Sequence, residues 1–234
     1  MNKSLFQRTL LSLVPTVLLI TLCYFWADPA FAIWSDHENL RRFPVFDYAT
    51  HLVDVIMIWS FLYYAYFTFS FTHQKSNCLG SNRVLAVGLP KNSNEKTFQW
   101  PFLNVANSVA ISIFIKDALK APFGRYWPST WVNNNPSLIH DHAYGFHWFH
   151  KGVIYQSFPS GHTTVAVAFM ISLWLTFPRS LWRWLGVFVA IAVVVGLLAD
   201  DYHFIGDCIA GAWVGAVVAI YVVAVTLNKK VIQS

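Results

Sequence analysis

Long apolar runs separated by short polar segments dominate the chain. Six of these runs approach the length of about 20 mostly apolar residues that a helix needs to cross a membrane. They cover residues 9–27, 50–72, 99–117, 160–177, 181–200 and 206–227. Polar residues within a span usually face the interior of a helical bundle. The pattern therefore predicts an all-α, polytopic membrane bundle with six transmembrane helices, folded as one domain over residues 1–234.

The first apolar run has two interpretations. Lys3 and Arg8 precede it, and Ala30-Phe31-Ala32 resembles a signal-peptidase site, which is the pattern of a cleaved signal peptide. The run is longer than the apolar region of most signal peptides, which favours a retained first span within residues 1–32. Both interpretations give the same order of spans downstream.

The distribution of Lys and Arg sets the orientation of the predicted bundle. With the amino terminus inside, ten of these residues fall inside and six outside, in agreement with the positive-inside rule. Residues 74–98 are then a polar cytoplasmic loop, and residues 117–159 form a long outer loop of the kind that often carries function. We expect a multi-pass protein of the inner membrane with both termini inside and the active site facing the periplasm.

Composition narrows the class of protein further. Of the 234 residues, 56% are hydrophobic and only 12% are charged, which is too little charged surface for a soluble domain. The net charge of +5 is scattered between the apolar runs, so a nucleic-acid partner is not expected. The three cysteines form no C-x-x-C pair, which argues against a disulfide scaffold and a zinc–thiolate site.

The first of three polar clusters follows the third predicted span. Lys120 and Arg125 bracket Pro122 and Gly124, which end a helix. Two cations around such a turn can clamp a phosphate group, Arg through paired hydrogen bonds and Lys as a point charge. Ordinary snorkelling of the two side chains to the membrane surface is the alternative.

The second cluster, Pro159-Ser160-Gly161-His162, leads directly into the fourth predicted span. Pro and Ser are typical of a helix start, where unpaired backbone amides bind anions. Gly161 permits close approach of a ligand, and His162 is placed to donate a proton to it. A capped helix with an interfacial histidine is the alternative.

The third cluster lies between the fifth and sixth predicted spans. His203 and Asp207 are four residues apart, so a helix that reaches back to His203 would place both on one face. A carboxylate bound to one imidazole nitrogen fixes the tautomer and leaves the other nitrogen able to attack. The alternative is a helix cap beside a solvated histidine. Alternating spans place all three clusters on the outer side.

These residues resemble the type-2 phosphatidic acid phosphatase superfamily, which includes lipid phosphatases and vanadium haloperoxidases. The family pattern is Lys, six residues, Arg-Pro; then Pro-Ser-Gly-His; then Ser-Arg, five residues, His, three residues, Asp. The second motif matches completely, and the third matches at His203 and Asp207. Two phosphate-binding arginines of the pattern are replaced, one by Trp127 and the other by Leu197. The resemblance covers residues 100–227 and implies the haloperoxidase-like helical core.

The resemblance implies a lipid phosphatase that acts on a phosphate monoester or pyrophosphate through a phosphohistidine, without metal or other cofactor. His203 would be the nucleophile, Asp207 its support and His162 the general acid. The phosphate ligands would be the side chains of Lys120, Arg125 and Ser160 and the amide of Gly161.

Several alternatives remain open. The partners would be a lipid phosphate substrate and membrane lipids, and the lipid could be phosphatidate, phosphatidylglycerol phosphate, an isoprenoid pyrophosphate or a phosphorylated glycolipid. A lipid phosphotransferase of the same fold and a non-catalytic phospholipid-binding protein are the alternative functions. A histidine cluster of the outer loop also offers a zinc or copper site, as against an aromatic lid; its members are His140, His142, His147 and His150.

Overall fold

The structure, a computed structural model, describes residues 3–79, 93–131, 134–178 and 180–232, and every regular element in that part of the chain is helical. The amino-terminal elements are α1 (Lys3–Leu22), the π-helical turn η1 (Cys23–Ala27), α2 (Asp28–His37), η2 (Leu40–Arg42), α3 (Pro44–Thr50) and α4 (Leu52–Leu79). The remaining elements are α5 (Ser93–Phe123), α6 (Leu138–Asp141), η3 (Val153–Tyr155), α7 (Gly161–Thr176), α8 (Leu181–Ala199) and α9 (Ile205–Ile232).

Five helical stretches of the described chain are long and apolar enough to cross a membrane. They are Lys3–His37, Pro44–Ser70, Pro101–Phe123, Leu181–Ala199 and Ile205–Thr226. These stretches indicate a multi-pass membrane protein, and the all-helical class is confirmed. The predicted count of six spans is not, because the run at 160–177 forms the shorter helix α7, Gly161–Thr176.

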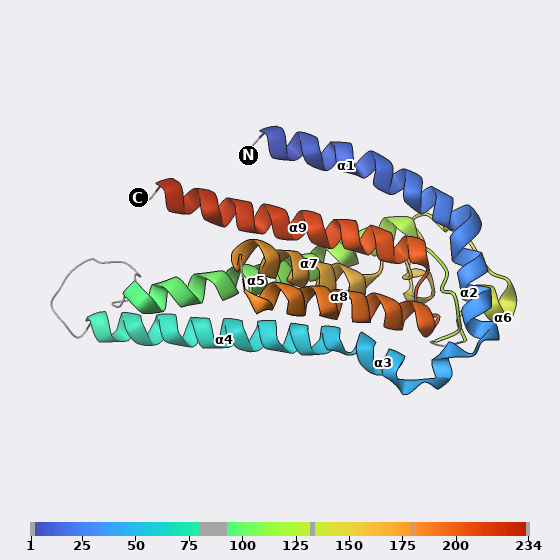
Figure 1. The fold of residues 1–234 in the computed structure, drawn as a ribbon, viewed down its shortest axis with the longest axis horizontal. Coiled ribbons are helices and arrows are strands. Elements are labelled where there is room, and N and C mark those ends of the chain that lie inside the picture. The colour runs from blue at the N-terminus through green and yellow to red at the C-terminus, as the bar shows by residue number, and fades with distance from the viewer. Residues whose placement is uncertain (1–2, 80–92, 132–133, 179, 233–234) are drawn as a thin grey trace.

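The helices lie side by side and give the bundle two distinct ends (Figure 1). The start of α1, the end of α9 and the facing ends of α4 and α5 lie at one end, and α2, α3 and α6 lie at the other. Helix α4 runs to Leu79 and α5 begins at Ser93, so the predicted loop 74–98 is helical at both margins. Residues 80–92 of that predicted loop lie outside the described residues.

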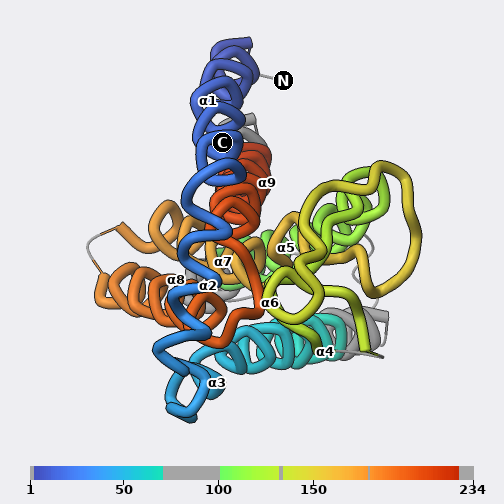
Figure 2. The backbone as a smooth tube through the Cα atoms, turned by 90° about the vertical axis from the view of Figure 1, so that its right-hand side faces the viewer, coloured from blue at the N-terminus to red at the C-terminus, as the bar shows by residue number. Residues whose placement is uncertain are grey.

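Helix α7 lies in the middle of the bundle and packs against α5, α8 and α9 (Figure 2). Its two sides are both apolar, as expected for a helix that is buried all round. Small residues let α9 approach α7 closely, since a Cβ atom at Gly211 would lie only 2.5 Å from the carbonyl oxygen of Ser160. The start of α7 is thereby held against the start of α9, and these two helix ends carry the second and third polar clusters.

Candidate active site

The Pro159-Ser160-Gly161-His162 motif forms the start of α7, as its sequence predicts. Ser160 is the N-cap residue, and its hydroxyl accepts a hydrogen bond from the amide of Thr163 at 3.3 Å. The Ser160 amide in turn donates to the carbonyl oxygen of Asp207 at 3.1 Å. The first turn of α7, including His162, is therefore fixed directly to the first turn of α9.

His203 lies in the turn between α8 and α9 and is almost fully buried. Its Nδ1 atom is 3.6 Å from Oδ2 of Asp207. The same carboxylate oxygen accepts hydrogen bonds from the Ser157 hydroxyl at 2.6 Å and from the Phe204 amide at 3.1 Å. Helix α9 begins at Ile205 and does not reach back to His203, so a helix-capping turn, not a shared helical face, brings the pair together.

Burial lowers the pKa of His203, although its contact with Asp207 acts in the opposite direction. The imidazole is therefore neutral at pH 7 and carries one unprotonated nitrogen. Because Nδ1 faces the Asp207 carboxylate, the proton belongs on Nδ1 and the lone pair on Nε2. This is the arrangement that a nucleophilic histidine requires.

The two histidines of the predicted pair face each other across a narrow space. The ring centroids of His162 and His203 are 6.5 Å apart, and the rings are inclined at 59°. Two rings this close can act on one substrate group, one as nucleophile and the other as proton donor. The structure thus brings together two side chains that are 41 positions apart in the sequence.

Two lysines of α5 approach the start of α7. A Cβ atom at Gly161 would lie 2.9 Å from Cδ of Lys116, so the Lys116 side chain covers the backbone there. Its Nζ atom also donates to Asp117 at 2.6 Å. Lys120 lies one turn further along α5, with Nζ 6.0 Å from the centre of the Trp127 ring. Lys116 is absent from the family motif, and only the structure shows its contact with Gly161.

A scan against models of protein families matches residues 101–230 to the model described as the PAP2 superfamily. The chain belongs to the PAP2 superfamily. Searches of curated proteins and of solved structures return no significant match. The matched segment contains all three polar clusters, and the family predicted from them is confirmed. Superfamily members are generally phosphatases, which supports an activity on phosphate esters.

Trp127 stands where the PAP2 pattern has its first arginine. Its ring lies 5.2 Å from the ring of His203, and its Nε1 atom donates to the carbonyl oxygen of Val153 at 2.9 Å. Tyr202 completes an aromatic wall, 5.2 Å from Trp127 and 5.7 Å from His162. The departure from the pattern therefore replaces a cation with a buried aromatic surface that packs beside the His203 ring.

Arg125 lies in a different place from the exposed phosphate clamp that its sequence position predicts. The residue is fully buried, and its guanidinium donates to Asp28 at 2.7 Å, to Asp207 and to the Tyr144 hydroxyl at 2.9 Å. Burial opposes the charge, but the two carboxylates outweigh it and raise the pKa of Arg125. Its side chain positions Asp207, which in turn contacts His203.

Asp28, which the sequence motifs do not single out, completes this buried group. Its other carboxylate oxygen, Oδ1, accepts a hydrogen bond from the Gly206 amide at 2.8 Å. Asp28 begins α2, so the group joins the amino-terminal helices to the start of α9. A signal for Asp28 does exist in the sequence, since a carboxylate within an apolar stretch usually has a buried partner.

The outer loop is folded around Arg125. The Arg125 amide donates to the carbonyl oxygen of Tyr155 at 2.8 Å, and the Ser157 amide donates to the carbonyl oxygen of Arg125 at 3.2 Å. Gly124 adopts a φ of 50°, and a Cβ there would collide with the backbone of His147.

Of the four loop histidines, His147 and His150 have ring centroids 5.8 Å apart. Among the described residues, no three His, Cys, Asp or Glu side chains are grouped to hold a metal ion.

We expect Asp28→Leu to destabilise the fold by about 2–5 kcal/mol, because it takes one acceptor from the buried Arg125 guanidinium and leaves the Gly206 amide unpaired. Apparent Tm in detergent measures the loss. Asp36→Asn, which changes an exposed carboxylate of the same helix, is the control and should shift stability by less than about 0.5 kcal/mol. Equal, small effects of both changes would contradict the role of the buried group.

A second prediction concerns Asp201, which lies in the turn before His203. Both of its carboxylate oxygens are buried, and the nearby Ser35 hydroxyl, which lies close enough to oppose the effect of burial, donates to the backbone carbonyls of Leu198 and Ala199 instead. Burial raises the pKa of this carboxyl from its ordinary 3.8 to about 7. A raised pKa means that the folded state holds a proton which the unfolded state has lost, so stability falls as pH rises from about 4 to 7.

Asp201→Asn removes this titration, and Asn tolerates the positive φ of 52° at this position. We therefore expect the variant to raise apparent Tm in detergent at pH 8 by several degrees, and to raise it less at pH 5. The gain at each pH is the apparent Tm of the variant minus that of the wild type, and the gains at pH 8 and pH 5 are then compared. The same gain at both pH values would contradict the buried, titrating carboxyl.

Proposed function

We propose that the protein is a membrane lipid phosphatase that hydrolyses a phosphate monoester or pyrophosphate through a phosphohistidine at His203. The observation that carries the proposal is the pair of facing imidazoles, 6.5 Å apart, with Asp207 behind one of them. Membership of the PAP2 superfamily supports chemistry on phosphate esters. The site lies at the end of a bundle of apolar helices, which favours a lipid over a soluble phosphate ester.

In the first step, Nε2 of His203 attacks the phosphorus atom, and the bond between phosphorus and the lipid oxygen breaks. Burial and the neighbouring His203 lower the pKa of His162 to about 4, so His162 is neutral in the free protein and takes up its proton together with the anionic phosphate. It then gives this proton to the leaving oxygen, so the lipid departs as an alcohol. Asp207 stabilises the positive charge that develops on the imidazole ring of His203. The products of this step are the free lipid alcohol and a phosphorylated His203.

In the second step, His162 removes a proton from a water molecule whose oxygen attacks the phosphorus. The bond between phosphorus and Nε2 breaks, which releases phosphate and returns His203 to its neutral form. Charge on the equatorial oxygens is offset by Lys116 and Lys120 and by the backbone amides at Gly161, at the positive end of α7. Arg125 takes no part in binding phosphate in this scheme and acts through Asp207.

We also propose that residues 1–32 remain part of the active protein. Cleavage after Ala32 would remove Asp28, which accepts hydrogen bonds from Arg125 and from the Gly206 amide. The orientation proposed from the Lys and Arg distribution places the site on the periplasmic face of the inner membrane. If an acceptor lipid attacks the phosphohistidine in place of water, the same chemistry makes the protein a lipid phosphotransferase.

The test is release of inorganic phosphate by the protein purified in detergent. Four lipids are supplied in excess EDTA: phosphatidate, phosphatidylglycerol phosphate, an isoprenoid pyrophosphate and a phosphorylated glycolipid. We expect turnover of at least one, and we expect His203→Ala to reduce it by more than about 10³-fold, because it removes the nucleophile.

His37→Ala is the matched control, because the His37 side chain is 83% exposed and lies outside the site. It should retain wild-type turnover. Undiminished phosphate release by His203→Ala, with the variant inserted and folded, would refute the assignment. Activity that EDTA abolishes and zinc restores would assign the chemistry to a metal instead.

A further inference from the structure

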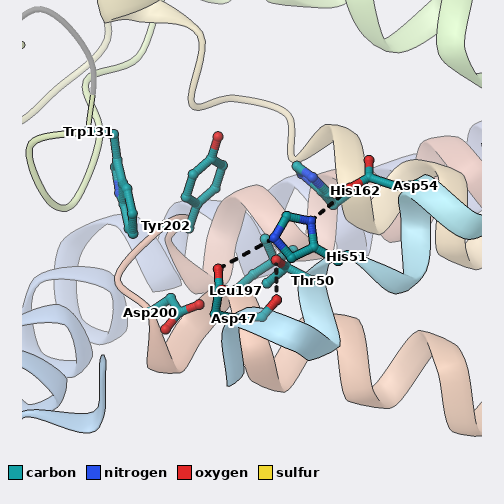
Figure 3. A pocket seen from close by; sticks show the side chains of 9 residues that line it. All are labelled: Asp47, Thr50, His51, Asp54, Trp131, His162, Leu197, Asp200 and Tyr202. Carbon is teal, nitrogen blue, oxygen red and sulfur yellow. Dashed lines mark hydrogen bonds and ion pairs between the residues drawn. The ribbon is translucent and has the colours of Figure 1, made fainter. Parts of the chain in front are cut away.

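A pocket opens beside His162, and three carboxylates are among the side chains that line it (Figure 3). It is lined by Asp47, Thr50, His51, Asp54, Trp131, His162, Leu197, Asp200 and Tyr202. The carboxylates come from α3, α4 and the end of α8, which are separate in the sequence. His162 and Tyr202 line this pocket and both lie beside His203, so the pocket adjoins the place where the phosphate group is proposed to react.

Two of the three carboxylates already have a partner. Nδ1 of His51 is 2.8 Å from Asp54, and its Nε2 is 3.7 Å from Asp47. The two carboxylates share this single imidazole, so even a protonated His51 leaves them with a net charge of −1. Both are substantially exposed at the rim, where they set the charge at the pocket entrance.

Asp200 is different because it is buried and unpaired. The residue is only 5% exposed, its side chain lines the pocket, and within the described chain no group donates a hydrogen bond to its carboxylate or forms an ion pair with it. Unlike the oxygens of Asp201, those of Asp200 are not shut off from the pocket, so they can accept hydrogen bonds from a cation that enters it. Figure 3 shows Asp200 near Asp47 among the side chains that line the pocket.

The charges around Asp200 favour a cation as the ligand of its carboxylate. Burial and the neighbouring Asp47 raise the pKa of Asp200 to about 6, so the carboxylate is still ionised at pH 7. Arg41 lies nearby, but its guanidinium stacks on Trp131 at 3.9 Å and donates to Ser129 at 2.9 Å. The group therefore keeps a negative charge that its protein neighbours do not neutralise.

The pocket also occupies the position where the PAP2 pattern has its second arginine. Leu197 stands there, fully buried and in the pocket lining. Gly196 beside it packs on α3, where a Cβ would lie 2.5 Å from the carbonyl oxygen of Phe46. Helix α3 thus brings Asp47 close to the position of that arginine, and the local charge changes from positive to negative. A second anionic group would be repelled here.

We propose that this acidic pocket selects a lipid phosphate whose alcohol carries a primary ammonium group within a few ångströms of the reacting phosphate. The proposal rests on the proposed function, since His162 protonates the leaving oxygen and the pocket beside it must hold the alcohol part of the lipid. Lys116 and Lys120 bind the phosphate, and Asp200, Asp47 and Asp54 bind the ammonium in the pocket beside His162. The preferred substrate is a zwitterion.

The experiment compares two lipids that differ only in the charge of the nitrogen. One is a long-chain phosphate monoester with a primary amine two carbons from the phosphate oxygen, and the other is the same lipid with that amine acetylated. We expect kcat/KM for the amine to exceed that for the acetylated lipid by about tenfold or more, the value of one charge-assisted hydrogen bond. Asp200→Asn should reduce this ratio about tenfold.

Glu38→Gln is the matched control, because it removes a half-exposed carboxylate that does not line the pocket. It should leave the ratio unchanged. Asp47→Asn serves as a second variant at the exposed rim and should lower the ratio by a smaller factor, so the test survives if Asp200→Asn does not fold. Equal turnover of both lipids by the wild type would overturn the inference and leave the proposed function intact.

Binding of the two lipids to His203→Ala, measured by calorimetry in detergent, tests the pocket apart from turnover. A preference for the amine that Asp200→Asn abolishes supports the inference even if neither lipid is hydrolysed, a result that would count against the proposed function alone. Equal binding of both lipids overturns it. Stimulation of the acetylated lipid by a soluble amine or Mg²⁺, lost in Asp200→Asn, would assign the pocket to a separate cation and also overturn it.

Discussion

The buried contact between Arg125 and two carboxylates is the constraint on which the rest of the structure depends. Asp28 comes from the start of α2 and Asp207 from the start of α9, and the outer loop supplies the guanidinium between them. Removing Arg125 would leave two buried carboxylates without their cation, and removing either carboxylate would leave buried guanidinium N–H groups without an acceptor. The three segments must therefore meet in one arrangement. The outer loop is therefore fixed from beneath, and it carries Trp127 and Ser157 to His203.

This constraint explains how the site tolerates the loss of two arginines of its family. Asp207 is held by Arg125 on one oxygen and by Ser157 and the Phe204 amide on the other, so it faces Nδ1 of His203 without help from substrate. In the proposed mechanism, positive charge for the phosphate comes from Lys116 and Lys120 of α5 and from the start of α7. The pocket beside His162, where Leu197 replaces the second arginine, is lined by carboxylates.

The sequence was most informative where function depends on neighbours along the chain. Ser160 caps α7 as its motif predicts, and the spacing of His203 and Asp207 correctly places them in contact, although through a turn instead of a helical face. It was least informative about long-range partners. Nothing near Arg125 in the sequence identifies Asp28 as its partner, and no motif relates Asp47 to Asp200, because helix packing alone decides which distant carboxylates meet.

The central claim is that phosphate passes through a covalent bond to His203. Rapid acid-free quenching during turnover of a lipid labelled with ³²P, followed by peptide mapping, measures that bond directly. The account predicts a label that is labile in acid, stable in alkali and located on His203, and predicts that it accumulates when His162 is replaced by Ala and a lipid with an activated leaving group is used. Phosphate release without any labelled protein, or a label on another residue, would contradict the account.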